Sequence, residues 1–447
     1  MSSKTSPERF SASSNGPSAE ADRRSAAPDR PAGEDRYTAE EERPSEPVNV
    51  LWVIDHVCYD GSLHGGGRLY WNLVPRFDPR RVRIVPCFLR SSEILRRVFA
   101  EAPAPVRILE KSKFDITTVW TLLRLIRAER IDVMHLHCYG ASSFGRIAGW
   151  IAGVPTIVHD YDTEVYFPYP WYLWLFDRVL SGMTRGAVAA SPMVREFAIR
   201  TRKIAPEKIR LMFHAVPEEK FQELSSKRIA GIRAELGLGP EVEIVGTVTK
   251  LGPQRGNVDL VRAAHRVLQH RPETIFLLIY KETVYHRDPQ KKYVSDPKLD
   301  RSEEGRQGLL DLIRQLGIED RVLLIDGWDR SDEYIAAMDV VTAPFQSRRF
   351  SSVKLLEAMA QAKPVVATEL GEQRELIRDG REGYLVPPGD IDRLAERIEH
   401  CLAHPEERRR LGRRARETAR KHSVPSVVTD LGRWYRQLAG ERRRRRR

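Results

Sequence analysis

Short apolar runs alternate with amphipathic segments along the chain from residue 48 onward. The runs in the first half that predict buried strands lie at residues 50–54, 82–88, 133–136, 156–158 and 187–190. The spacing of apolar positions between them predicts helices at 118–127 and 144–151. Strands that alternate with helices in this way are typical of a doubly wound parallel α/β sheet.

The same alternation is repeated in the second half of the chain. The apolar runs that predict strands there lie at residues 242–246, 275–279, 322–325, 340–343 and 365–367. After the run at 340–343, Ser351 or Ser352 can cap a helix with Val353, Leu356 and Met359 on one face. We therefore predict a second α/β domain with a strand–loop–helix–strand unit.

Composition and pattern divide the chain into five parts. Residues 1–46 have almost no large apolar side chains, so this segment is expected to be disordered. A first α/β domain is predicted at 47–222 and a second at 223–423. An amphipathic stretch at 424–440 predicts a terminal helix, and residues 441–447 form a basic tail.

The formal net charge is +12, and part of it lies in the arginine run at 442–447. Such a run can attract nucleic acid, but aromatic and basic residues do not interleave elsewhere, so a nucleic-acid partner is not expected. Four cysteines show no metal-ligand or redox spacing. With neither an apolar leader nor an uncharged apolar stretch of membrane-spanning length, the sequence predicts a cytoplasmic protein.

Residues 166–176 are rich in tyrosine, tryptophan and phenylalanine. Aromatic side chains with polar tips suit a membrane interface, so this stretch is a candidate for peripheral contact with the inner face of a membrane. The alternative is a helix that packs its aromatic side chains into the domain, with Phe176, Val179 and Leu180 continuing the apolar stripe. The sequence leaves both interpretations open.

Glycines and charged residues follow several predicted strands. The glycines at 65–67 follow the first strand, where a glycine backbone can approach a ligand closely. Lys250 and Arg255 flank a glycine-bearing turn before a helix, which suits a diphosphate. Lys354 and Glu357 share one helix face, which suits a phosphate and the hydroxyls of a ribose; an intrahelical salt bridge is the alternative.

The stretch from Ser351 to Met359 precedes a series of further motifs. These are Lys363-Pro-Val-Val-Ala-Thr, Gly371, Glu375, Gly380, Gly383 and Val386-Pro-Pro-Gly-Asp390. Together they resemble the retaining glycosyltransferases of family 4, also called group 1. The family signature is a pair of glutamates separated by seven residues; Glu357 matches the second, and Arg349 stands in place of the first.

The resemblance covers roughly residues 48–425 and implies the GT-B fold. In this fold, two Rossmann-like, doubly wound parallel-sheet domains face a central cleft, and the helix at 424–440 would cross back to the first domain. The implied reaction transfers a sugar from a nucleoside diphosphate sugar with anomeric retention, without a metal ion or other cofactor. UDP and GDP sugars are the expected donors, and the acceptor is a glycan, a lipid-linked molecule or a small molecule.

The resemblance also assigns roles to individual residues. Those expected to act in catalysis are His159, Lys250, Arg255 and Glu357. Those expected to bind the donor are Gly66, Gly67, Lys250, Arg255, Ser351, Ser352, Val353, Lys354 and Glu357. Lys250 and Arg255 would hold the diphosphate, Glu357 the ribose hydroxyls and His159 the donor sugar.

Other polar residues near the predicted strand ends carry weaker signals. His135 and His137 more often belong to a packed core at such positions than to a site. Asp160-Tyr-Asp162 is formally the metal-binding D-x-D sequence of a different glycosyltransferase fold, and the α/β pattern argues against that interpretation. Asp160 and Glu164 remain candidates for contact with a polar acceptor.

Several positions depart from the family pattern. Arg349 replaces the first glutamate, His214 stands where the family usually has asparagine, and Tyr280 precedes a long charged loop at 281–304 that could act as a lid. These departures support a second hypothesis, a catalytically inactive GT-B-fold scaffold or regulatory protein. The sequence does not identify the base, the sugar or the acceptor.

Overall fold

The computed structural model describes residues 46–55, 58–59, 62–63, 65–90, 106–112, 115–161, 171–281, 302–348 and 353–446. The segment expected to be disordered, most of the loop at 281–304, Arg349, Ser351 and Ser352 lie outside the described residues. Among the helices that are described, none combines the length and apolar character that crossing a bilayer requires.

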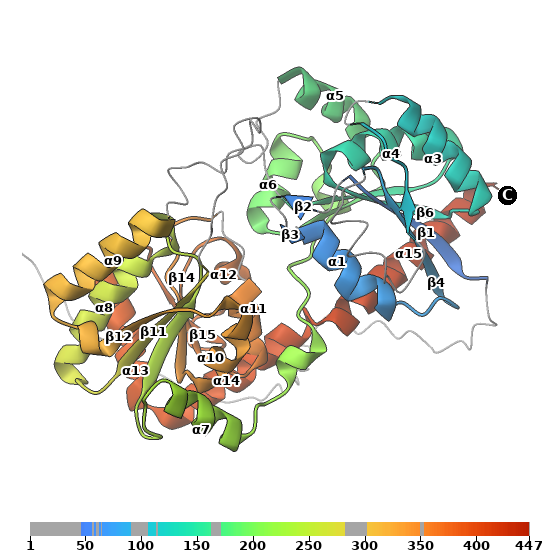
Figure 1. The fold of residues 1–447 in the computed structure, drawn as a ribbon. Helices are drawn as coiled ribbons and strands as arrows, with labels where there is room; N and C mark the ends of the chain where they lie inside the picture. The colour runs from blue at the N-terminus through green and yellow to red at the C-terminus, as the bar shows by residue number, and fades with distance from the viewer. Residues whose placement is uncertain are drawn as a thin grey trace, which may run out of the picture. The chain divides into compact units, whose positions relative to one another are not determined.

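The first half of the chain forms a parallel sheet of seven strands in the order β5-β4-β1-β6-β7-β8-β9 (Figure 1). The strands are β1 (Val48–Ile54), β4 (Val82–Phe88), β5 (Arg107–Ile108), β6 (Val133–His137), β7 (Thr156–Asp160), β8 (Gly186–Ala189) and β9 (Ile209–Leu211). A short antiparallel pair, β2 (Cys58–Tyr59) and β3 (Ser62–Leu63), follows β1. Parallel neighbours need crossover connections, and these place helices on both faces of the sheet.

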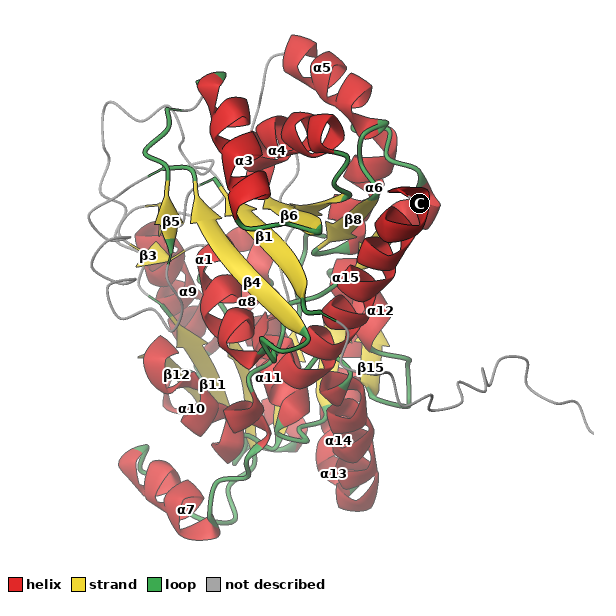
Figure 2. Cartoon of the chain, turned by 90° about the vertical axis from the view of Figure 1, so that its right-hand side faces the viewer, coloured by secondary structure: helices red, strands yellow, loops and turns green. Residues whose placement is uncertain are grey.

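Alternating side chains of β1 contact two different helical layers. Leu51 and Val53 pack with α3 (Thr117–Ala128) and α4 (Cys138–Ala152), and α5 (Trp171–Ser181) lies beside α4. Trp52 and Ile54 pack on the opposite face with α1 (Gly65–Leu73) and α15 (Val424–Arg446), and α15 runs along this sheet in Figure 2. Helix α6 (Pro192–Arg200) packs against β8.

The second half forms a parallel sheet of six strands in the order β12-β11-β10-β13-β14-β15. The strands are β10 (Ile244–Val248), β11 (Ile275–Tyr280), β12 (Val322–Asp326), β13 (Val340–Ala343), β14 (Val365–Thr368) and β15 (Gly383–Val386). The helices are α7 (Ser226–Glu235), α8 (Asn257–His270), α9 (Ser302–Leu316), α10 (Ser331–Ala337), α11 (Val353–Ala360), α12 (Gly371–Leu376), α13 (Ile391–Ala403) and α14 (Pro405–Arg420). Strand β10 starts two residues later than the apolar run predicts, and the N–H of its first residue, Ile244, donates to Asp339 Oδ2 at 3.0 Å.

The last helix, α15, follows the second sheet in the chain but packs on the first. Ser423, the residue before α15, forms a parallel bridge with Val216. The apolar side chains of α15 join the core around Trp52. The helix continues to Arg446, so residues 441–446 are helical rather than a separate tail. Arg442 donates to the carbonyl oxygens of Ile131 and Gly153 at 2.8 Å each, which holds this end against the first domain.

Candidate functional site

Three buried histidines lie at the carboxyl ends of β6 and β7. His137 pairs with His159 in the parallel register, and His135 lies two residues earlier on β6. Because strand side chains alternate, all three lie on the sheet face that α15 covers. Their ring centroids are 4.4 Å (His135–His137), 5.2 Å (His135–His159) and 5.0 Å (His137–His159) apart.

A chain of hydrogen bonds joins this cluster to α15. Trp52 Nε1 donates to Tyr435 Oη at 3.0 Å, and Tyr435 Oη lies 2.5 Å from His135 Nδ1. His135 Nε2 lies in turn 3.2 Å from His159 Nδ1. We infer an arrangement in which the tyrosine hydroxyl donates to His135 Nδ1 and a neutral His135 donates from Nε2 to His159 Nδ1. This order leaves the proton of His159 on its Nε2 atom.

Burial holds the pKa of His159 well below its usual 6.5, and His137 and His214 lower it further. Burial, followed by the charge of His159, lowers the pKa of His135 in the same way. Both imidazoles are therefore neutral at pH 7, with one donor and one acceptor nitrogen each. A neutral His159 can donate a hydrogen bond to a hydroxyl without adding a charge to the site.

The three histidines also meet the first requirement of a metal site, because their ring nitrogens lie within 4.8 Å of one another. Their geometry fits hydrogen bonding better. The planes of the His135 and His159 rings differ by 14°, and His135 Nε2 lies at hydrogen-bond distance from His159 Nδ1, 3.2 Å away. Both nitrogens of His135 are also engaged with Tyr435 and His159. We interpret the cluster as a hydrogen-bonded one.

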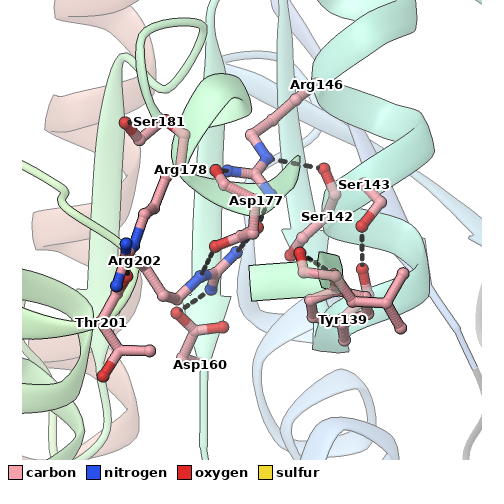
Figure 3. A network of polar contacts seen from close by, with 11 residues as sticks. Tyr139, Ser142, Ser143, Arg146, Asp160, Asp177, Arg178, Ser181, Thr201 and Arg202 are labelled. Carbon is pink, nitrogen blue, oxygen red and sulfur yellow. Dashed lines mark hydrogen bonds and ion pairs between the residues drawn. The ribbon is translucent and has the colours of Figure 1, made fainter. Parts of the chain in front are cut away.

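A second buried polar cluster lies on the opposite face of β7, toward α4 and α5 (Figure 3). Arg202 bonds to Asp160 and to Asp177, with Nε 2.7 Å from Asp177 Oδ2. Arg146 also bonds to Asp177. Burial opposes the ionisation of Asp177, but Arg202 and Arg146 outweigh it and lower its pKa to about 2. The cluster ties α4 and α5 to the sheet.

This cluster bears on the D-x-D sequence and the predicted acceptor contacts. The carboxylate of Asp160 is buried and held by Arg202, so it faces the protein interior. Asp162 and Glu164 lie outside the described residues. No described residue therefore stands out as the acceptor contact that the sequence suggested.

Lys250 and Arg255 lie on the turn between β10 and α8. Lys250 follows the strand by two residues, and Arg255 ends the 3-10 turn η4 (Pro253–Arg255) directly before the helix. Asn257, the first helical residue, donates from Nδ2 to the Lys250 carbonyl at 3.2 Å. Both cations thus stand at the carboxyl edge of the second sheet, beside a helix amino terminus.

The same turn is fixed to the segment after β13. Gly256 has a φ of 73°, and a Cβ there would collide with the Pro344 carbonyl oxygen, so glycine alone permits the close approach. Gln346 N donates to Gln254 O at 2.9 Å. The turn is therefore held against the described segment at 344–348, which precedes α11 in the chain.

Lys354 and Glu357 lie on α11, whose first residue is Val353. Lys354 Nζ donates to Glu357 Oε2 at 2.8 Å and to Ser331 Oγ at 2.7 Å, and it lies 5.0 Å from the Trp328 ring centroid. The intrahelical salt bridge that the sequence left as an alternative is therefore present. The carboxylate that was expected to bind ribose is buried beside a lysine.

A buried carboxylate, Asp55, lies at the carboxyl end of β1. Gly66 and Gly67 are in the first turn of α1. Asp55 follows β1 directly, Arg90 Nη2 donates to both of its oxygens at 2.8 and 2.9 Å, and a Cβ on Gly140 would lie 2.6 Å from Asp55 Oδ2. Sequence analysis missed Asp55, although an acidic residue directly after an apolar strand was an available signal.

The strand orders bring the predicted residues to two sheet edges. Gly66 and Gly67 follow β1, and His159 lies on β7 at the same carboxyl edge of the first sheet. In the second sheet, β10 and β13 are neighbours, so the turn at 250–255 and α11 follow adjacent strands. Tyr435 was missed, because nothing in the sequence marks its contact with His135, 300 positions away.

Two family models match the chain. Residues 63–220 match the model described as Glycosyltransferase Family 4, and residues 229–418 match the model described as Glycosyl transferases group 1. The Anabaena protein Alr3699/HepE, whose structure was solved in complex with UDP, superposes with a TM-score of 0.71 at 18% identity. The superposition covers 87% of this chain and 100% of that one.

Two curated bacterial proteins are similar in sequence over parts of the chain. N-acetyl-alpha-D-glucosaminyl L-malate synthase of Bacillus anthracis is 37% identical over 110 residues, 25% of this chain and 29% of that protein. UDP-Gal:alpha-D-GlcNAc-diphosphoundecaprenol alpha-1,3-galactosyltransferase of Escherichia coli is 23% identical over 291 residues, 62% and 68% of the two chains. The match thus spans less than a third of the first relative and about two thirds of the second.

The two sheets, the site elements and the family models agree. The chain belongs to the glycosyltransferases of the family 4, or group 1, type and has the GT-B fold with two parallel α/β domains. The resemblance and the fold class predicted from the sequence are thereby confirmed. The roles of the individual site residues stay predictions.

Proposed function

We propose that this chain transfers a sugar from a nucleoside diphosphate sugar to an acceptor hydroxyl, with retention at the anomeric carbon and without a metal ion. One observation carries the proposal: the turn at 250–255 is fixed against the segment that leads to α11. Two cations and a helix start on one sheet edge suit a leaving diphosphate, which gains negative charge as the bond to the sugar breaks.

In this proposal, the diphosphate binds Lys250, Arg255 and the amino terminus of α11 at Ser351, Ser352 and Val353. Glu357 accepts hydrogen bonds from the ribose hydroxyls. A carboxylate has two oxygens, so Glu357 can keep Lys354 on Oε2 while it binds the ribose. In this arrangement Lys354 acts by positioning the Glu357 carboxylate, and it does not need the direct phosphate contact that the sequence suggested.

His159 orients the donor sugar through the Nε2–H that its hydrogen-bonded chain provides. A neutral donor suits this role, because a positive imidazolium would compete with Lys250 and Arg255 for the diphosphate. Gly66 and Gly67 allow the backbone of the first domain to approach the donor phosphates closely.

Retention follows if the acceptor attacks the anomeric carbon on the face from which the diphosphate departs. The new carbon–oxygen bond forms as the bond to the phosphate oxygen breaks, and that oxygen takes the proton of the acceptor hydroxyl. No second carboxylate is needed as a nucleophile, in contrast to retaining glycosidases. The protein contributes positioning and stabilisation of charge.

The relatives support a UDP-type donor. The Escherichia coli relative is named for UDP-galactose and a diphosphoundecaprenol acceptor, and Anabaena HepE was solved with UDP. We propose UDP sugars as the first donors to test and GDP sugars as the next. The acceptor is a glycan, a lipid-linked molecule or a small molecule, reached at the cytoplasmic side of a membrane.

The direct test is a thermal-shift panel with UDP, GDP, ADP and dTDP sugars, followed by a donor-hydrolysis assay with and without EDTA. A shift with one nucleotide and EDTA-insensitive hydrolysis support the proposal. Glu357→Ala and Arg255→Ala should each lose hydrolysis, whereas Arg409→Ala on the exposed face of α14 should keep it. Full activity in both site variants contradicts these residue roles.

The alternative is an inactive scaffold of the same fold, and the Lys354–Glu357 salt bridge favours it. In this hypothesis the bridge is purely structural and Arg349 marks the loss of donor binding. Isothermal titration in which no nucleoside diphosphate or its sugar binds supports the scaffold. Binding that is lost in Glu357→Ala rules it out.

A further inference from the structure

The exposed apolar side chains of the first domain gather on one helical layer. Helix α4 contacts both α3 and α5, and these three helices lie on the same side of the first sheet (Figure 1). Helix α5 exposes five large apolar residues, which are Trp171, Tyr172, Leu175, Phe176 and Val179. Its two neighbours expose four more, which are Ile116 at the start of α3, Trp120, Trp150 and Ile151.

Exposed apolar side chains are concentrated on the layer that α3, α4 and α5 form. Among the residues that the structure describes, ten large hydrophobic side chains are exposed, and the only one outside these nine is Trp71 on α1. Trp120, Trp150 and Trp171 are 65%, 66% and 75% exposed. Apolar groups on this scale usually mark an interaction surface, because exposing them to water is unfavourable.

The outward face of α5 is fixed by contacts on its inner side. Asp177 and Leu180 are buried, and Asp177 is held by Arg146 and Arg202 (Figure 3). Positions 172, 175, 176 and 179 follow the spacing of one helix face and therefore point away from these anchors. The buried network of Asp177, Arg146 and Arg202 therefore also holds the apolar face of α5 toward solvent.

The charges of the three helices have one sign at the surface. The sequences of α3 and α4 contain no aspartate or glutamate, and α5 contains only Asp177, which is buried. Arg124, Arg127 and Arg178 are exposed on the same helices. The layer therefore offers aromatic and aliphatic side chains among cations, with no exposed carboxylate of its own.

A basic hollow borders the layer beside Trp150. It has a volume of about 410 Å³ and lies where α4 and α5 end and α15 passes. Its lining includes Arg185, Lys208 and Arg445, and one carboxylate, Glu441, which pairs with Arg185 at 2.5 Å. A hollow with this excess of cations suits a phosphate headgroup.

We propose that the outer surface of α3, α4 and α5 docks on an anionic lipid bilayer. Tryptophan and tyrosine are enriched at the membrane–water interface, where an apolar ring meets polar headgroups. Exposed arginines contribute attraction to anionic lipids and hold the surface at headgroup depth. This proposal concerns a partner of the first domain and stands whether or not the chain transfers a sugar.

Two other occupants fit the surface less well. A second copy docked through the same face would bring Arg124 and Arg127 against a surface whose helices expose no carboxylate to neutralise them. Residues 1–45 contain no leucine, isoleucine, valine or tryptophan, and Phe10 and Tyr37 are their only aromatic residues. That segment therefore has too little apolar surface to cover nine large side chains.

The test is vesicle flotation of the full chain with phosphatidylcholine alone and with about 30% phosphatidylglycerol added. The wild type should float with the anionic vesicles and be released by salt. Trp120→Ser, Trp150→Ser and Trp171→Ser combined should lower the partition coefficient at least about tenfold, equivalent to about 1.4 kcal/mol. Trp71→Ser is the matched control and should bind like the wild type.

A second variant tests the charges. Arg124→Gln combined with Arg127→Gln should weaken binding to anionic vesicles by roughly fivefold per arginine and leave binding to phosphatidylcholine unchanged. Unfolding temperatures and far-ultraviolet circular dichroism establish that each variant is folded. Equal flotation of the wild type and the triple variant overturns the proposal, as does a wild-type dimer that the triple variant converts to monomer without any vesicle binding.

Discussion

The hydroxyl of Tyr435 lies 2.5 Å from Nδ1 of His135, which joins the last helix of the chain to a strand of the first sheet. Trp52 Nε1 donates to the same oxygen at 3.0 Å. His135 Nε2 lies 3.2 Å from His159 Nδ1, so we infer that Tyr435, 276 positions further along the chain, influences the tautomer of the histidine proposed to contact the donor sugar.

Tyr435→Phe should test this relationship. The change leaves the Trp52 N–H and His135 Nδ1 unsatisfied in the core, so the free energy of unfolding should fall by about 1–3 kcal/mol. The ¹⁵N chemical shifts of His159 should move from the Nε2–H form toward a mixture of tautomers, and kcat should fall with little change in the KM of the donor. Unchanged ¹⁵N chemical shifts of His159 contradict this link between Tyr435 and His159.

Acid should destabilise the protein below pH 6.5. His135 and His159 are neutral in the folded state because burial lowers their pKa well below 6.5, whereas the unfolded chain takes up protons near pH 6.5. The unfolded state therefore binds more protons as the pH falls, and each histidine should cost about 1.4 kcal/mol per pH unit until its folded pKa is reached. The contribution of the two neutral histidines to the free energy of unfolding is fully present above pH 6.5.

Urea midpoints measured between about pH 7.5 and 5.5 check this slope. His422 also has a pKa lowered by burial and adds to the slope in the same direction. His159→Gln should flatten the dependence by the share of one histidine. A wild-type stability that is constant over this range contradicts a neutral buried cluster.

Glu357→Ala should separate the ribose role from the salt bridge. Loss of hydrogen bonds to a charged acceptor should lower kcat/KM for the donor by about 100-fold, equivalent to about 2.7 kcal/mol. Glu396→Ala, on the exposed face of α13, is the control and should change nothing. Donor hydrolysis with varied UDP sugar is the measurement, and equal values in the two variants contradict a ribose contact.

Gly256→Ala should disrupt the phosphate turn. Its φ of 73° disfavours any residue with a Cβ, and the added atom would collide with the Pro344 carbonyl. Gly237→Ala is the matched control, because it has a φ of 71° and no atom within 4 Å of the added Cβ. Both variants should lose about 1–2 kcal/mol through the left-handed backbone conformation. Only Gly256→Ala should also lose nucleotide-induced thermal stabilisation.

Asp177→Asn should be among the most destabilising single changes in the first domain. It removes the negative charge that Arg146 and Arg202 share in the interior, and an uncompensated buried charge costs about 3–5 kcal/mol. Asp430→Asn, which breaks an exposed pair with Arg433, should change stability by less than about 1 kcal/mol. Chemical denaturation compares the two, and similar losses contradict the role of the buried network.

The amino-acid sequence by itself determined the two parallel sheets and the family, because both depend on local patterns. Apolar runs between amphipathic segments predict buried strands wherever they occur, and the motifs from Ser351 to Asp390 lie within forty residues of one another. The turn at 250–255 was likewise located from the sequence, since its two cations and glycine lie in one short stretch, and its phosphate-binding role stays a prediction.

Only the tertiary structure decided which side chains meet across the chain. In the folded protein Lys354 forms a salt bridge with Glu357, Asp160 is buried beside Arg202, and Tyr435 contacts His135. The tertiary structure also turned the apolar face of α5 outward, where the sequence slightly favoured a helix packed into the domain. Apolar periodicity shows that a face is apolar, but whether that face is covered depends on how distant segments pack, and no local pattern records that.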